Sequence, residues 1–144
     1  MVRGEKGQLK LSFGMIFSII LIIVFISAAF FGIKKFISFQ QEVQVGQFAQ
    51  DLQNDVDKMW RSNQGSQEVS YILPKFIENV CFRKDDNANL FFQASRFVDA
   101  KNIDNINIDE IVGTKKAVCF ENNEGRVTMN LEKDYGEALV MITE

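Results

Sequence analysis

A continuous apolar run constrains this chain more than any other feature of its sequence. The run extends from Leu11 to Ile33 and holds 23 residues without one charged side chain. At a helical rise of about 1.5 Å per residue it would measure about 35 Å, whereas the hydrocarbon core of a bilayer is about 30 Å thick. The run therefore predicts a transmembrane helix, and the more polar sequence after it predicts one small domain carried by that anchor.

Charge is divided unevenly along the chain. Residues 1–35 hold five basic side chains and one acidic one, whereas the remainder holds 11 basic and 18 acidic side chains. Nucleic-acid phosphates require clustered Lys and Arg, so the acidic remainder argues against a nucleic-acid partner. Three basic residues precede the apolar run and two follow it closely. This balance favours a cytoplasmic N-terminus and a domain outside the cell membrane.

Residues 1–10 form a basic leader before the run, and three interpretations of this arrangement stay open. A secretory signal peptide would be removed near Ser27-Ala28-Ala29. A plain signal anchor requires only the hydrophobicity of the run, with membrane lipid as its partner. The third interpretation rests on Lys6-Gly7-Gln8, which stands shortly before the run.

Lys6-Gly7-Gln8 followed by a long apolar helix resembles the class III signal peptide of archaeal type IV pilins and related filament subunits. The resemblance implies that a prepilin-type peptidase cuts between Gly7 and Gln8, on the cytoplasmic side. It also implies a filament whose core is built from the apolar helices of a homo- or hetero-oligomer. Many pilins carry Glu at the fifth mature position, where this chain has Ser12, so the resemblance supports processing more directly than polymerisation.

Small residues within the apolar run permit close helix packing. Gly14 and Ser18 form one small-xxx-small pair, and Ala28 and Gly32 form another. Such pairs allow helix backbones to approach each other in a membrane. Small residues are also common in membrane helices in general, so chance remains an equally good explanation.

The helical pattern continues beyond the run. From residue 34 to 62 apolar residues mostly recur at steps of three and four, with polar side chains between them. No proline occurs from Leu11 to Ser62. The pattern predicts one helix of about 50 residues, apolar on all sides over residues 11–33 and amphipathic over residues 34–62, which ends near Ser62-Asn63-Gln64-Gly65. A juxtamembrane helix that pairs as a short coiled coil is the alternative.

From residue 67 the apolar period changes to two, which is typical of strands. Candidate strands cover residues 69–73, 76–82, 90–92, 114–121, 126–132 and 138–143, and residues 94–111 are predicted to be an irregular loop. Asn122-Asn123-Glu124-Gly125 is a hairpin signal between two of these strands. Residues 67–144 therefore predict an antiparallel β-sheet domain, a meander on which the amphipathic helix packs, and the fold class is α+β.

Cys81 and Cys119 are the only cysteines, and both lie within predicted strands. In an extracytoplasmic domain an even count predicts a disulfide, which for positions 38 apart contributes roughly 4 kcal/mol in the loop-entropy model. Two free thiols, buried as small hydrophobic side chains, are the alternative. A zinc site is not expected, because two thiolates without histidine do not complete a ligand set.

The search for catalytic motifs finds little. The chain has no histidine, no phosphate-binding glycine loop and no nucleophile elbow. Asp85, Asn87 and Asn89 resemble the start of a calcium loop. However, Leu90 replaces the required glycine and Arg96 stands where the bidentate acid belongs, which favours a turn.

Two functions follow from the sequence, and neither is enzymatic or requires a cofactor or metal. The first is a pilin-like subunit or minor component of a type IV pilus-like filament or secretion system, assembled through the apolar helix. The second is a membrane-tethered binding module that does not polymerise and presents its sheet to a partner.

Overall fold

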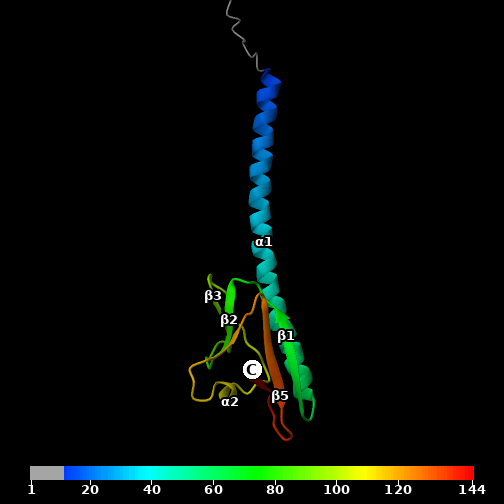
Figure 1. The fold of residues 1–144 in the computed structure, drawn as a ribbon, viewed down its shortest axis with the longest axis vertical. Coiled ribbons are helices and arrows are strands. Elements are labelled where there is room, and N and C mark those ends of the chain that lie inside the picture. Colours follow the sequence, from blue (N-terminus) through cyan, green and yellow to red (C-terminus); the bar gives the residue numbers. More distant parts are fainter. Residues whose placement is uncertain (1–11) are drawn as a thin grey trace, which may run out of the picture. The chain divides into compact units, whose positions relative to one another are not determined.

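A computed structural model describes residues 12–144 and shows an α+β fold (Figure 1). The helices are α1 (Phe13–Arg61) and α2 (Ile108–Val112). The strands are β1 (Gly65–Ile72), β2 (Ile77–Phe82), β3 (Leu90–Ala94), β4 (Val118–Glu121), β5 (Arg126–Lys133) and β6 (Met141–Thr143). The described residues form two compact units, which meet between Gln40 and Gln41 inside α1.

α1 is a single helix of 49 residues, which confirms the predicted continuous helix. At its start the Ser12 carbonyl accepts hydrogen bonds from the backbone N–H groups of Met15 and Ile16, at 2.8 and 3.3 Å. At its end the Met59 carbonyl accepts hydrogen bonds from both the backbone N–H and the hydroxyl of Ser62, at 3.0 and 2.6 Å. The helix therefore ends in the polar segment that the sequence indicates.

The unit from Gln41 to Glu144 contains two antiparallel sheets of three strands each. One sheet has the strand order β1-β5-β6 and the other has the order β3-β2-β4. β1 pairs with β5 along its full length, from Gly65 opposite Lys133 to Ile72 opposite Arg126. β2 lies at the centre of the second sheet, between β3 and β4.

Consecutive strands β2 and β3, and β5 and β6, pair antiparallel, but the strands do not form a single meander and the predicted hairpin is wrong. The turn itself exists, because the backbones of Asn123 and Arg126 exchange hydrogen bonds of 2.9 and 3.0 Å, and Glu124 and Gly125 have positive φ. However, β4 before the turn pairs with β2, and β5 after the turn pairs with β1. The turn moves the chain from one sheet to the other. Turn residues report local backbone geometry, whereas strand partners depend on contacts distant in the sequence.

The predicted loop at residues 94–111 contains most of the short helix α2. Asn107 caps this helix, because its side-chain oxygen accepts a hydrogen bond of 3.2 Å from the backbone N–H of Glu110. A helix of five residues is too short to show an apolar period in the sequence. Two strands are also shorter than predicted, since β4 begins at Val118 and β6 begins at Met141.

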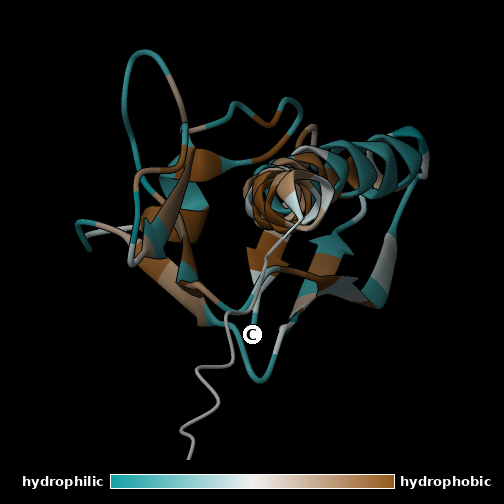
Figure 2. Cartoon of the chain, turned by 90° about the horizontal axis from the view of Figure 1, so that it is seen from above, coloured by the Kyte–Doolittle hydropathy of each residue, from teal (hydrophilic) through white to brown (hydrophobic). Residues whose placement is uncertain are grey.

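The core of this unit lies between α1 and both sheets. The side chains of α1 that are buried there are Val45, Phe48, Leu52, Val56 and Met59. The Phe48 ring packs edge-to-face on Tyr71 of β1 and Phe92 of β3, with ring centroids 5.3 and 6.0 Å apart. One helical side chain therefore contacts a strand of each sheet. Figure 2 shows hydrophobic and hydrophilic colours mixed along the strands and hydrophilic colours over most of the loops.

We expect Phe48→Ala to lower the free energy of unfolding by about 3–5 kcal/mol, because it removes a buried ring and leaves a cavity between the sheets. Urea unfolding followed by the fluorescence of Trp60 would measure this loss. Val43→Ala is the matched control, because Val43 lies on the same helix and is 42% exposed. Equal losses for the two variants would contradict the central position of Phe48.

Candidate functional site

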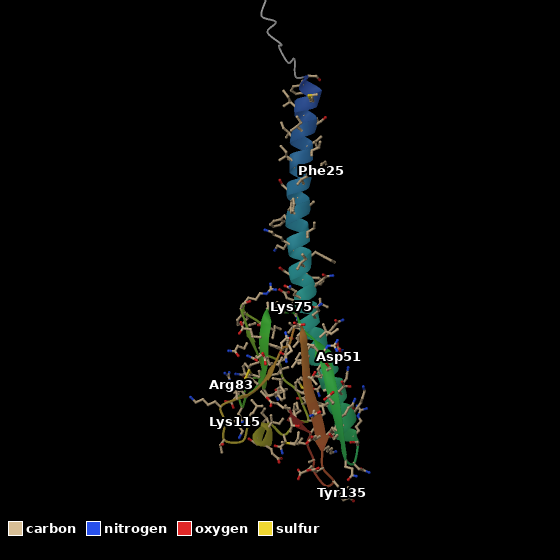
Figure 3. All side chains as sticks on the ribbon, in the orientation of Figure 1. Phe25, Asp51, Lys75, Arg83, Lys115 and Tyr135 are labelled. Atoms are coloured by element: carbon tan, nitrogen blue, oxygen red, sulfur yellow. A yellow bond between two sulfur atoms is a disulfide. The ribbon has the colours of Figure 1, made fainter. Side chains whose placement is uncertain are left out.

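The apolar part of α1 is a candidate membrane span. Its most apolar 18-residue window has a mean hydropathy of 2.9, and none of that window is buried. Among the described residues α1 is the one helix that is long and apolar enough to cross a bilayer. Figure 3 shows Phe25 projecting from this part of the helix. A helix of this kind near an N-terminus is compatible with an anchor, although a signal sequence has the same character.

The four predicted helix-packing residues share one face of this helix. Gly14 and Gly32 are separated by about five full turns at 3.6 residues per turn, and Ser18 and Ala28 fall within about 40° of the line joining them. All four are exposed in the chain. The Ser18 hydroxyl donates to the Gly14 carbonyl at 2.9 Å, so this polar group is satisfied within its own helix. This face of the helix therefore carries small side chains, and the Ser18 hydroxyl on it is already hydrogen-bonded.

The predicted processing residues, Gly7 and Gln8, lie outside the described residues. Ser12, which stands at the position where many pilins carry Glu, is described and directly precedes α1. Its place at the start of the helix suits a serine, which is a favoured residue there.

The predicted disulfide is present. Cys81 of β2 and Cys119 of β4 are bonded to each other and lie directly opposite in the strand register. Their neighbours Val80, Phe82 and Phe120 are buried, whereas Cys119 is exposed and Cys81 is half-buried. The bond therefore lies on the outer face of the sheet and clamps an edge strand to the central strand.

A cleft of about 400 Å³ lies within the unit that begins at Gln41. Arg96 dominates its wall: the guanidinium carbon lies 3.8 Å from the centroid of the Phe76 ring, and the same group donates a hydrogen bond to the side-chain oxygen of Gln41. Phe97 beside it is 89% exposed. Two basic and two acidic side chains line the cleft, so its charge selects no particular ion.

Sequence reasoning did not find this cleft. In the sequence Arg96 stands only as a misfit in a calcium loop, and its partner Gln41 is 55 positions away in the chain. An arginine beside a phenylalanine in a loop was the only signal, and it does not identify the ring on which the guanidinium stacks.

Tyr71 carries the most perturbed titratable group in the described residues. Its hydroxyl donates to a carboxylate oxygen of Asp55 at 2.9 Å, and Lys58 lies 2.9 Å from the other carboxylate oxygen. Burial raises the pKa of Tyr71 above its ordinary value of 10.0, and the hydrogen bond and negative charge of Asp55 and the charge of Asp51 raise it further. This arrangement positions the helix on β1 and supplies no nucleophile at neutral pH.

The residues that resembled a calcium loop are engaged elsewhere. One Asp85 oxygen accepts from the backbone N–H of Asn87 at 3.2 Å, and the other lies 3.2 Å from the guanidinium of Arg83. Asn89 exchanges hydrogen bonds of 2.7 and 2.8 Å with the backbone of Ile103. In the described part of the chain no group of three His, Cys, Asp or Glu side chains is placed to hold a metal ion.

Comparisons with protein-family models, with curated proteins and with solved structures found no match for this chain. The case for a function therefore depends on the sequence and on the geometry described above.

We expect the free energy of unfolding to fall as the pH rises above 10.0. A raised pKa in the folded state means that the stabilising contribution of Tyr71 is complete below the pKa of the unfolded chain and is lost at higher pH, by up to about 1.4 kcal/mol per pH unit. Urea unfolding at a series of pH values would measure this slope.

Tyr71→Phe should reduce this slope, and Tyr135→Phe is the matched control because the Tyr135 ring is 82% exposed. If the wild type and Tyr71→Phe lose stability in parallel above pH 10, the interaction of Tyr71 with Asp55 is not the cause.

Proposed function

We propose that this chain is a membrane-anchored, pilin-like subunit or minor component of a type IV pilus-like filament or secretion system. The apolar part of α1 anchors the chain in lipid and assembles with the same helix of neighbouring subunits. The observation that carries the proposal is the 49-residue helix, which is uncovered and apolar in its first part and buried in a small domain in its second part.

The small-residue face of α1 supports assembly through the helix. Between helices in a membrane there is no hydrophobic driving force, so association depends on close packing of backbones. Gly14, Ser18, Ala28 and Gly32 lie on one face and remove bulk there, while large side chains occupy much of the remaining circumference. A neighbouring helix can therefore approach this face more closely than any other.

The distribution of charge and the disulfide support a domain on the outer side of the cell membrane. More basic residues precede the apolar run than follow it closely. Disulfides persist in oxidising environments, and Cys81 and Cys119 are paired. With the N-terminus in the cytoplasm, the Gly7–Gln8 bond would be accessible to a prepilin-type peptidase.

A non-polymerising, membrane-tethered binding module is the second candidate. Ser12 favours it, since a carboxylate that many pilins carry at this position is missing here. The cleft around Arg96 also favours the binding module, because a cleft of about 400 Å³ next to the exposed ring of Phe97 suits a partner molecule.

The first test concerns processing. Protein purified from the membranes of its native host should begin at Gln8, as measured by intact mass and N-terminal sequencing. Gly7→Val should abolish cleavage because it changes the residue before the cut, whereas the matched variant Gly4→Val should be processed like the wild type. A wild-type chain that begins near Met1 would contradict the class III interpretation and favour the tethered module.

The second test concerns packing of the helix. Ser18→Leu fills the small-residue face and should lower the association constant of subunits by about fivefold or more, because each close contact contributes about 1 kcal/mol. Sedimentation of sheared filaments and electron microscopy would measure the polymer.

Ser27→Leu is the matched control for this test. Ser27 donates to the Ile23 carbonyl at 2.8 Å, as Ser18 does to Gly14, but it lies on the far side of the helix. Equal assembly of both variants would exclude the small-residue face, and a wild type without polymer would leave the tethered module.

A further inference from the structure

β1 is the long strand whose outer edge stays unpaired in the described part of the chain. It pairs with β5 alone and stands at the end of its sheet. It runs for eight residues without a register shift and contains neither proline nor lysine. Natural proteins use such residues and irregularities to protect exposed edges, because an open edge pairs readily with another strand.

The remaining sheet edges in the described residues are short or partly covered. β4 has four residues and β6 has three. Val140, just before β6, exchanges backbone hydrogen bonds of 2.9 Å with Asn105 and Asn107. Leu90, at the start of β3, exchanges backbone hydrogen bonds of 3.0 and 2.9 Å with Lys101. The edge of β1 is therefore different from the other edges in both length and openness.

The alternation of hydrogen bonds identifies the backbone groups at this open edge. The backbone N–H of Leu73 donates to the Gly125 carbonyl at 2.9 Å, and this pair continues the register of β1 with β5. In an antiparallel pair only alternate residues bond to the partner strand. Odd-numbered residues of β1 therefore bond to β5. The N–H and C=O groups that face away from β5 belong to Ser66, Glu68, Ser70 and Ile72.

A groove runs between this edge and α1. It has a volume of about 370 Å³ and is lined by Gln44, Gln47 and Asp51 of α1 and by Ser70 and Ile72 of β1. Its buried floor is formed by Phe48 and Tyr71, which are 2% and 8% exposed. Figure 3 shows Asp51 on α1 beside β1. An open strand edge next to a helix is a geometry in which an extended peptide can add to a sheet as a further strand.

The charged side chains around the groove indicate which kind of peptide would bind there. Asp51 lines it and Glu68 lies on the exposed edge, and the ion pairs found among the described residues involve neither. Burial raises the pKa of Tyr71 in the floor, and the nearby charges of Asp55 and Asp51 raise it further. Ile72 at the edge is 69% exposed and offers an apolar contact.

We propose that the groove between α1 and β1 binds an extended segment of a partner polypeptide, which adds to the sheet as a fourth strand. Basic side chains of this segment contact Asp51 and Glu68, and an apolar side chain contacts Ile72. The partner is not a second β1, because pairing two copies would bring two acidic edges together. This binding site does not depend on filament formation, since it lies wholly within residues 41–144.

Two synthetic octapeptides test the proposal on the full chain in nanodiscs of zwitterionic lipid. One has the sequence Thr-Lys-Val-Thr-Lys-Val-Val-Thr, whose two Lys project from opposite faces of an added strand, one on the side of Glu68 and one on the side of Asp51. The other has Glu in place of both Lys. The Lys peptide should slow hydrogen exchange at the amides of Ser66, Glu68, Ser70 and Ile72 by about tenfold or more. It should also bind about fivefold more tightly than the Glu peptide, and Asp51→Asn with Glu68→Gln should remove this preference.

A variant of the edge itself gives a sharper test. Ser70→Pro removes one outward N–H without touching the bonds to β5 and should weaken binding of the Lys peptide by about fivefold or more. Ser70→Ala is the matched control and should bind like the wild type. Both variants lose the hydrogen bond of 3.2 Å from the Thr128 hydroxyl to the Ser70 hydroxyl, so they differ at the edge alone.

Three results would overturn the proposal. The first is unchanged exchange at the four amides in millimolar Lys peptide. The second is equal binding of the two peptides. The third is protection of these amides without peptide that increases with protein concentration, which would mean that a second copy covers the edge. Should Ser70→Pro fail to fold, the exchange pattern of the wild type decides alone.

Discussion

The packing of α1 between two small sheets is the contact on which the rest of the domain depends. A sheet of three strands has one apolar face and cannot bury it without a second layer. Phe48 meets both sheets through Tyr71 and Phe92, so a single helical position joins them. Burying the hydroxyl of Tyr71 without a partner would cost free energy. Asp55, which lies two turns after Phe48 on α1, accepts a hydrogen bond from this hydroxyl at 2.9 Å. Apolar contact and a satisfied polar group therefore position the helix together.

The long helix could be predicted because its signals are local and repeated. An unbroken apolar run, followed by apolar residues at every third or fourth position, indicates a helix along its whole length. The polar segment after residue 61 indicates where the helix ends. Strand partners carry no such signal. The turn at Glu124 and Gly125 was recognised from its residues, but nothing near it shows that β4 and β5 belong to different sheets. α2 was missed because five residues give no period.

The candidate sites differ in predictability for the same reason. The disulfide partners could be predicted from the number of cysteines alone, because the chain contains only Cys81 and Cys119. The stacking of Arg96 on Phe76 and the open edge of β1 require knowledge of which segments lie side by side. An edge strand and a central strand have the same alternation of apolar and polar residues, so the sequence of β1 does not show which one it is. Its pairing with β5 alone decides this.

The disulfide supports one of the short ladders, the pairing of β2 with β4. β1 and β5 are matched over eight residue pairs, whereas β2 and β4 are matched over four. A short edge strand frays readily, and the bond from Cys81 to Cys119 holds β4 against β2 at the centre of that pairing. β4 leads directly into the turn that sends β5 to the other sheet, so fixing β4 also fixes where β5 begins. A domain that places a covalent bond at this point is suited to an oxidising environment, which agrees with the proposed position outside the cell membrane.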